Sequence, residues 1–353
     1  MYDLPGGTFF TNYAEEMRVV RTPLRMILLI LFLIFMSVWP ILFASSSMVQ
    51  LFNIFIVWII AGHGLNILTG LCGQVSLGHA AFVGVGSYTA AILSTRYGFP
   101  FWISLPCAGL SSALIGVLFG LPSIRVKGYY LALTSMAAHF ILLYVFLHWE
   151  SLTGGIKGLS CAPVKVGHFS LDTPYKFFPF ALAFCVIMTS FFNNFKRSQI
   201  GRLFIAINNN DLAAEALGIN ISKYKLMAFG IGCFYAGIAG ALLAYNFQFV
   251  SLDYFPFIDS FWYVGILIIG GIGSVLGPIF GVIFIRWISQ LMNLHLAPLI
   301  AGLFPALGAQ IASSISVIVF ALIIMVFVVF EPRGLAYRWS VIKSYYRLWP
   351  FPY

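Results

Sequence analysis

The sequence predicts an all-α fold, a polytopic helical membrane protein with about ten transmembrane helices. Hydrophobic residues make up 61% of the 353 positions and charged residues only 8%, whereas a soluble domain is about one quarter charged. Apolar runs such as 24–44 and 311–330 are unbroken, unlike the alternating strands of a membrane barrel. Together these observations exclude a soluble enzyme, a disordered protein and a secreted disulfide scaffold.

The individual spans follow from the length of the apolar segments, because a helix needs about 20 residues to cross the hydrocarbon core. The third predicted span is rich in glycine, which allows the helix to break there. Only a short glycine-rich turn at 270–273 separates the eighth span from the ninth. The predicted spans are residues 24–43, 49–68, 74–95, 101–122, 128–148, 176–195, 223–247, 257–273, 274–293 and 312–331.

The basic residues predict the orientation of these spans, since Lys and Arg concentrate on the cytoplasmic side. Residues 1–23 are predicted as a cytoplasmic N-terminal segment and 332–353 as a cytoplasmic tail. When a basic residue in the first turn of a span is counted with the adjoining loop, fourteen of the 19 basic residues lie inside. Four lie outside and one, Arg286, falls within a span. The net charge of +9 is then explained by anionic lipid rather than by nucleic acid. The outside residues are Arg96, Lys157, Lys165 and Lys176.

The chain lacks the usual signatures of an enzyme. It has no Gly-Lys dipeptide for a phosphate-binding loop, and neither HExxH nor GxSxG occurs. The cysteines and histidines show no metal-ligand spacing. We therefore expect no catalytic residue, metal site or bound cofactor in this chain. The carboxylates Asp253, Asp259 and Glu331 approach the membrane only near span ends, which weighs against an ion-coupled transporter.

A polar stretch joins the second and third predicted spans. Its polar side chains can enter hydrocarbon only if they face protein or water, so one interpretation is that they line a substrate path. The other is tight helix packing, in which such groups make interhelical contacts. Ser76 and His79 share a helical face, and Gln74 joins them only if the helix breaks near Gly73 or Gly78. The candidate path residues are Asn66, Gln74, Ser76 and His79.

The longest internal inside loop, residues 196–222, predicts a short helix. Asn210 or Asp211 can cap its first turn, Glu215 lies near that positive end, and Gly218 suits a left-handed stop. Such a helix would offer a docking ridge to a soluble partner, although an ordinary interfacial connector would have the same pattern.

Arg286 lies inside the ninth predicted span beside Trp287. A charge at mid-bilayer is costly. We expect its side chain to extend to the outer interface beside Trp287. The alternative is a residue of the substrate path that attracts a carboxylate.

Several long motifs carry a resemblance to a known family. They include GQVSLGHAAF and GSYTAAIL within 66–93, and SQIGRLFIAINNNDLAAEALG from Ser198. LTGGIKGLS at 152–160, GGIGSVLGPIFG at 270–281 and EPRGL at 331–335 follow the same order as in the family. Over residues 50–335 the chain resembles the LivM-type permeases of high-affinity branched-chain amino acid ABC importers. The wider group includes LivH-type and urea permeases, and the LTGG loop favours the LivM type.

The resemblance implies a function and a set of partners. It implies a permease domain at 24–331 in the bacterial inner membrane, working by alternating access beside a second, LivH-like permease. Two ABC ATPases would hydrolyse the ATP, and a periplasmic binding protein would deliver the amino acid. The alternatives are a urea or short-amide importer and, from another class, an autonomous channel or secondary transporter. The implied ATPase-coupling residues are Asp211, Ala213, Ala214, Glu215, Ala216 and Gly218.

The resemblance also implies a fold like that of cobalamin-importer permeases, with a possible pseudo-two-fold repeat. The weak likeness between residues 73–78 and 271–277 fits such a repeat. The chain departs from the family at Asn208, Asn209 and Asn210, where charged residues are usual, and this difference leaves the identity of the ATPase partner open.

Overall fold

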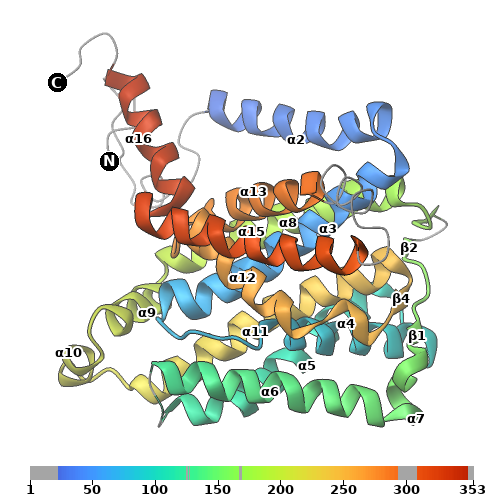
Figure 1. Cartoon of the computed structure of the whole chain (residues 1–353), viewed down its shortest axis with the longest axis horizontal. Helices are drawn as coiled ribbons and strands as arrows, with labels where there is room; N and C mark the ends of the chain where they lie inside the picture. The colour runs from blue at the N-terminus through green and yellow to red at the C-terminus, as the bar shows by residue number, and fades with distance from the viewer. Residues whose placement is uncertain (1–22, 125, 127, 167–168, 293–307, 349–353) are drawn as a thin grey trace.

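The computed structural model describes residues 23–124, 126, 128–166, 169–292 and 308–348, and these are almost wholly helical (Figure 1). Each predicted span coincides with a helix, which confirms the helical membrane fold. The predicted N-terminal segment lies outside the described residues apart from Pro23. The span helices are α2 (Pro23–Phe43), α3 (Ser46–Leu65), α4 (His79–Thr95), α5 (Phe101–Gly120), α6 (Tyr129–His148), α8 (Pro174–Arg197), α11 (Ile221–Phe247), α12 (Phe257–Gly270), α13 (Gly277–Leu291) and α15 (Gly308–Phe330).

Not all of these helices are long enough to cross a membrane unaided. Among the described residues, six are sufficiently long and apolar, and a seventh is obtained if Val317–Phe330 and Gly334–Tyr346 form one bent span. The angle between those two parts is 46°. At 17 and 15 residues, α4 and α13 are shorter, so the predicted number of ten is approximate. The predicted C-terminal tail contains the helix α16 (Gly334–Leu348).

The connecting elements are short and lie mainly at the two ends of the bundle. One end carries α7, η3 and four two-residue strands, and the other carries α9 and α10 (Figure 1). Their bounds are η1 (Asn66–Leu71), η2 (Leu121–Ile124), α7 (Glu150–Thr153), η3 (Gly155–Lys157), β1 (Leu159–Ser160), β2 (Lys165–Val166), β3 (Phe169–Ser170), α9 (Gln199–Asn209), α10 (Asp211–Ala216), β4 (Phe249–Val250) and η4 (Leu252–Tyr254).

The loops predicted to share one side of the membrane do meet in space. At one end the Asn208 side chain donates to the Gly70 carbonyl (3.3 Å), and Lys196 Nζ donates to the Gly273 carbonyl (2.6 Å). At the other end β1 pairs antiparallel with β4, and Thr95 Oγ1 donates to the Ser160 carbonyl (2.6 Å). The helices therefore alternate in direction as the charge pattern predicted.

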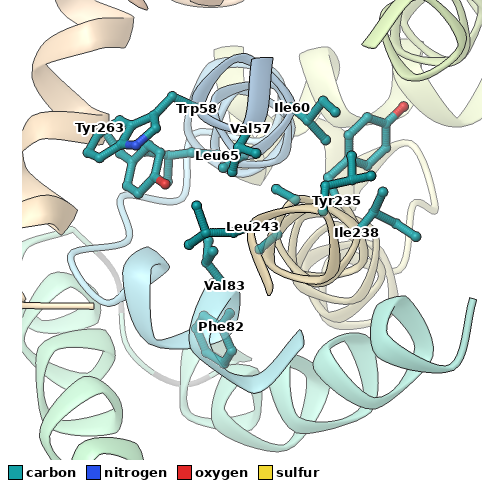
Figure 2. Packing of buried hydrophobic residues seen from close by; sticks show 14 of the residues in the cluster. Val57, Trp58, Ile60, Leu65, Phe82, Val83, Tyr235, Ile238, Leu243 and Tyr263 are labelled. Carbon is teal, nitrogen blue, oxygen red and sulfur yellow. The ribbon is translucent and has the colours of Figure 1, made fainter. Parts of the chain in front are cut away.

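The core is built around α11, which packs chiefly against α3, α4 and α5. Small residues allow this close packing. A Cβ atom at Gly240 would collide with the backbone of Val83 in α4. Because α4 and α11 are so close there, Ser87 Oγ donates to the Gly240 carbonyl (2.7 Å). Figure 2 shows side chains of α3, α4 and α11 packed together, so the start of α4 is held deep inside the bundle.

Candidate functional site

The predicted third span is broken, and its first residues are not helical. After α3 and the π-helical turn η1, the backbone is irregular from Cys72 and becomes helical again only at His79. The backbone N–H of Gln74 donates to the Leu68 carbonyl (2.9 Å), and His79 Nε2 lies 2.9 Å from the Ala61 carbonyl. The segment 72–78 therefore turns back beside the end of α3, and α4 begins within the bundle.

Glycine makes this break possible. Gly73 has φ = +73°, a conformation that other residues rarely adopt. At Gly78 a Cβ atom would collide with the Ser135 carbonyl of α6. The neighbouring Leu77 amide donates to Ser135 Oγ (2.8 Å). The predicted start of the span at residue 74 was wrong because these contacts fix an irregular backbone as far as residue 78.

The break decides which side chains face inward. Gln74 and Ser76 are 2% and 0% exposed, whereas Val75 is 37% exposed and Leu77 is half-buried. Inward and outward positions thus alternate, as they do in an extended chain. Gln74 and Ser76 are consequently both buried, although an unbroken helix would have placed them about 200° apart.

Asn66 joins the break at 72–78 to a second break, the turn at 271–276 between α12 and α13. Its side chain is fully buried; Nδ2 donates to the Ser274 carbonyl and Oδ1 accepts from the Gly273 amide, both at 2.8 Å. Both breaks lie at the same end of the bundle, and the helices leading into them run in the same direction. These two motifs therefore give no support to a two-fold axis in the membrane plane, and that repeat stays a prediction.

Several buried polar atoms around the break have no partner. Within the described part of the chain, both amide atoms of Gln74, Ser76 Oγ and His79 Nδ1 make no hydrogen bond. The ring nitrogens of His139 on α6 lie near backbone groups of Gly78 and Phe255 but make no hydrogen bond of ordinary geometry with any described residue. A buried polar group without a partner costs free energy, and in native proteins such groups often bind water or a ligand. The assignment of Asn66, Gln74, Ser76 and His79 to a substrate path stays a prediction.

His139 was missed by the sequence reasoning. It is fully buried and lies beside Gly78, one helical turn after Ser135, whose hydroxyl accepts from Leu77. The available signal was the pair of polar residues at positions 135 and 139, which share one face of an otherwise apolar helix.

Arg286 faces the interior of the bundle. Its guanidinium carbon lies 3.4 Å from the ring centroid of Trp58, which stacks on Tyr263 at 4.1 Å. Asp259 is close enough to interact electrostatically with the guanidinium. An aromatic face and a carboxylate in the first turn of α12 provide its partners. The predicted neighbour Trp287 was therefore wrong, and the approach of Arg286 to the outer interface stays a prediction. Trp287 itself is exposed.

The predicted short helix on the inside loop is present as α10. Asn210 Oδ1 accepts from the Ala213 amide (3.1 Å), so Asn210 is the capping residue. Gly218 has φ = +82° and ends the segment as predicted. Ala214 is buried, and Glu215 is exposed together with Leu212 (70%) and Leu217 (82%). Ala213, Ala216 and Gly218 are exposed and Asp211 is half-buried, so the segment presents a surface with two large apolar side chains.

A polar cavity separates this segment from the helix break. Its volume is about 340 Å³. Gln74 of the break and the first residue of α10, Asp211, line this same cavity. The sequence did not predict that the two segments lie so near each other. The cavity is lined by Cys72, Gly73, Gln74, Val126, Gly128, Leu131, Ile207, Asn208, Asn209, Asn210, Asp211 and Lys225.

The opposite end of the molecule holds the LTGG loop. Thr153 Oγ1 donates to the Phe146 carbonyl (2.6 Å) and lies 2.9 Å from that of Trp149, which fixes the loop on the end of α6. Burial raises the pKa of the Cys161 thiol to about 11, so at neutral pH it is protonated and a poor nucleophile. No three His, Cys, Asp or Glu side chains in the described ranges gather closely enough to hold a metal ion.

Comparison with known proteins adds independent findings. A family model described as the permease component of branched-chain amino acid transport systems matches residues 47–329. The high-affinity branched-chain amino acid permease protein LivM of Salmonella typhimurium is 33% identical over 280 residues, which are 72% of this chain and 65% of that protein. Its Escherichia coli counterpart is 32% identical over 290 residues, 75% and 68% respectively.

A more distant relative matches over a similar share of its length. The probable LivM permease of Methanocaldococcus jannaschii is 24% identical over 247 residues, covering 66% of this chain and 67% of that protein. The match thus spans about two thirds of the length of these curated relatives. No solved structure matches the chain.

Proposed function

Because the chain belongs to the family of branched-chain amino acid transport permeases, we propose that it is the transmembrane subunit of an ATP-driven importer. Its cargo would be a branched-chain or related amino acid. In this proposal the chain is not an enzyme and binds no cofactor, because ATP is hydrolysed by partner subunits. Its own contribution is conformational, through helices that open alternately to the two sides of the membrane.

The observation that carries the proposal is the position of α10. It is a capped helix at the end of the bundle, with Leu212 and Leu217 exposed. It packs against α9, and Asn208 of α9 donates to the Gly70 carbonyl at the break. Lys196 at the end of α8 donates to the Gly273 carbonyl of the second break. A displacement of α10 would be transmitted to both breaks through these contacts.

The partners follow from the same proposal. Two ABC ATPases would dock on α10 and its counterpart in a second, LivH-like permease. A periplasmic binding protein would contact the end that carries the LTGG loop and β1–β4. The protein would lie in the bacterial inner membrane with both termini in the cytoplasm. A urea or short-amide importer would use the same assembly with another binding protein.

Purification of the chain from its native membrane tests the proposal. We expect a second permease and two ATPases to co-purify, and the complex to take up radiolabelled leucine into vesicles only with ATP and the binding protein. Uptake by the chain alone, without an ATPase, would overturn the proposal and favour an autonomous transporter. ATP-dependent uptake of urea but not leucine would correct the cargo.

A further inference from the structure

The cavity beneath α9 and α10 has the size and lining of a small-molecule site. Its volume of about 340 Å³ falls within the range of about 300–1,000 Å³ that ligand sites occupy. One part of the lining is polar, with Gln74, Lys225 and the stretch 208–211. Another part is aliphatic. Its members are Val126, Leu131 and Ile207.

Two side chains of the lining are buried without partners. Lys225 is 8% exposed and makes no hydrogen bond or ion pair with the residues that the structure describes. Gln74 is 2% exposed, and neither atom of its amide has a partner there. A buried ammonium group is costly unless an anion or hydrogen-bond acceptor accompanies it. The positive charge of Lys225 thus indicates a ligand that carries a negative group.

We propose that this cavity binds an aliphatic amino acid from the cytoplasmic side and that binding slows import. The ligand's carboxylate lies beside the Lys225 ammonium. The ligand's ammonium group faces the side-chain oxygens of Asn208 and Asn209, and its hydrocarbon side chain contacts Val126, Leu131 and Ile207. The cytoplasmic direction and the identity of the ligand as transported product rest on the proposed function.

Inhibition follows from the elements that the cavity connects. Gln74 belongs to the helix break, Lys225 to α11 and Ile207 to α9, which leads directly into α10. A ligand that contacts all three stabilises their present arrangement. If the importer must change this arrangement in each cycle, the ligand and the transport cycle oppose each other. Product accumulated in the cytoplasm would thus reduce further uptake.

Vesicles containing the complete transporter provide the test. The lumen holds ATP and either no leucine or unlabelled leucine, and the initial uptake of external labelled leucine is measured with the binding protein present. Luminal leucine should slow uptake by roughly fivefold or more, the lower end of typical allosteric coupling. Leucinol, which lacks the carboxylate, should have no such effect.

Variants of Lys225 separate binding from transport. Lys225→Met keeps the aliphatic stem and should retain uptake into leucine-free vesicles while losing the inhibition, whereas Lys225→Arg should retain both. The matched control is Lys223→Met, an exposed lysine two positions away, which should behave as wild type. If Lys225→Met does not assemble, Val126→Trp reduces the cavity from its aliphatic part and should also abolish the inhibition.

The outcomes distinguish this inference from the proposed function. Normal uptake that luminal leucine does not slow, or slows equally in wild type and Lys225→Met, overturns the inference and leaves the function intact. Absence of leucine uptake under every luminal condition contradicts the proposed function instead. Equilibrium dialysis of labelled leucine against the purified complex then still tests the cavity, because wild type, Lys223→Met and Lys225→Arg should bind leucine there and Lys225→Met should not.

Discussion

Asn66 connects two parts of the chain that are far apart in sequence. Its side chain satisfies the Gly273 amide and the Ser274 carbonyl, so Asn66→Ala leaves two polar backbone groups without partners. We expect the free energy of unfolding to fall by about 1–3 kcal/mol, measured by thermal unfolding of the purified protein. The control is Asn246→Ala, since both amide atoms of Asn246 lack hydrogen-bond partners in the described chain. Equal destabilisation by the two variants would show that Asn66 does not hold the breaks together.

Arg286 is expected to contribute to stability through its contacts with Trp58 and Asp259. Arg286→Gln removes a cation–π contact worth about 2 kcal/mol in a desolvated site and leaves the Asp259 carboxylate without its positive neighbour. We therefore expect a lower melting temperature. In Arg286→Gln/Asp259→Asn, part of the lost stability should return, because no unpaired charge remains. Strictly additive effects of the two substitutions would contradict this electrostatic coupling.

The α10 helix is the element on which coupling to the ATPases should depend. Glu215→Lys reverses the charge of its exposed surface. Gly218→Leu places leucine in the left-handed conformation of Gly218, which costs a non-glycine residue about 1–2 kcal/mol. We expect both variants to insert into the membrane normally but to uncouple ATP hydrolysis from transport, so that leucine uptake falls much more than ATPase activity.

Gly98 provides the matched control for Gly218→Leu. It has φ = +64° and, like Gly218, open space where a Cβ atom would lie, but it sits at the opposite end of the bundle. Gly98→Leu carries a similar backbone cost and should leave the ratio of ATP hydrolysis to uptake unchanged. If Gly218→Leu and Glu215→Lys also import normally with wild-type partner assembly, α10 is not the coupling element.

Alternating access concerns the whole molecule and should change the accessibility of the helix break. Ser76→Cys and His79→Cys replace fully buried residues, so we expect little reaction with a water-soluble thiol reagent in the resting transporter. Their reactivity should rise when the ATPases are trapped with nucleotide. Val75→Cys should react in the resting state, because Val75 is partly exposed. Phe82→Cys should stay unreactive in both states. Equal inertness at positions 76 and 79 under both conditions would mean that the break is packing and that the path lies elsewhere.

The sequence by itself determined the helical membrane class, the positions of the spans, their alternation and the capped helix at Asp211–Ala216. Each of these depends on properties read locally along the chain: hydropathy over about 20 residues, basic residues in loops, and capping residues beside a helix. The glycines around residues 70–78 likewise indicated where a helix can break.

Only the tertiary structure decided how those elements meet. Asn66 finds its partners 207 and 208 residues away, and Arg286 faces inward because Trp58 and Asp259 lie on neighbouring helices. Gln74 and Ser76 are both buried because contacts with η1 and α6 keep the segment 72–78 from forming a helix. A polar side chain in a membrane takes whichever partner the folded bundle brings near, and the local pattern of the chain does not contain that information.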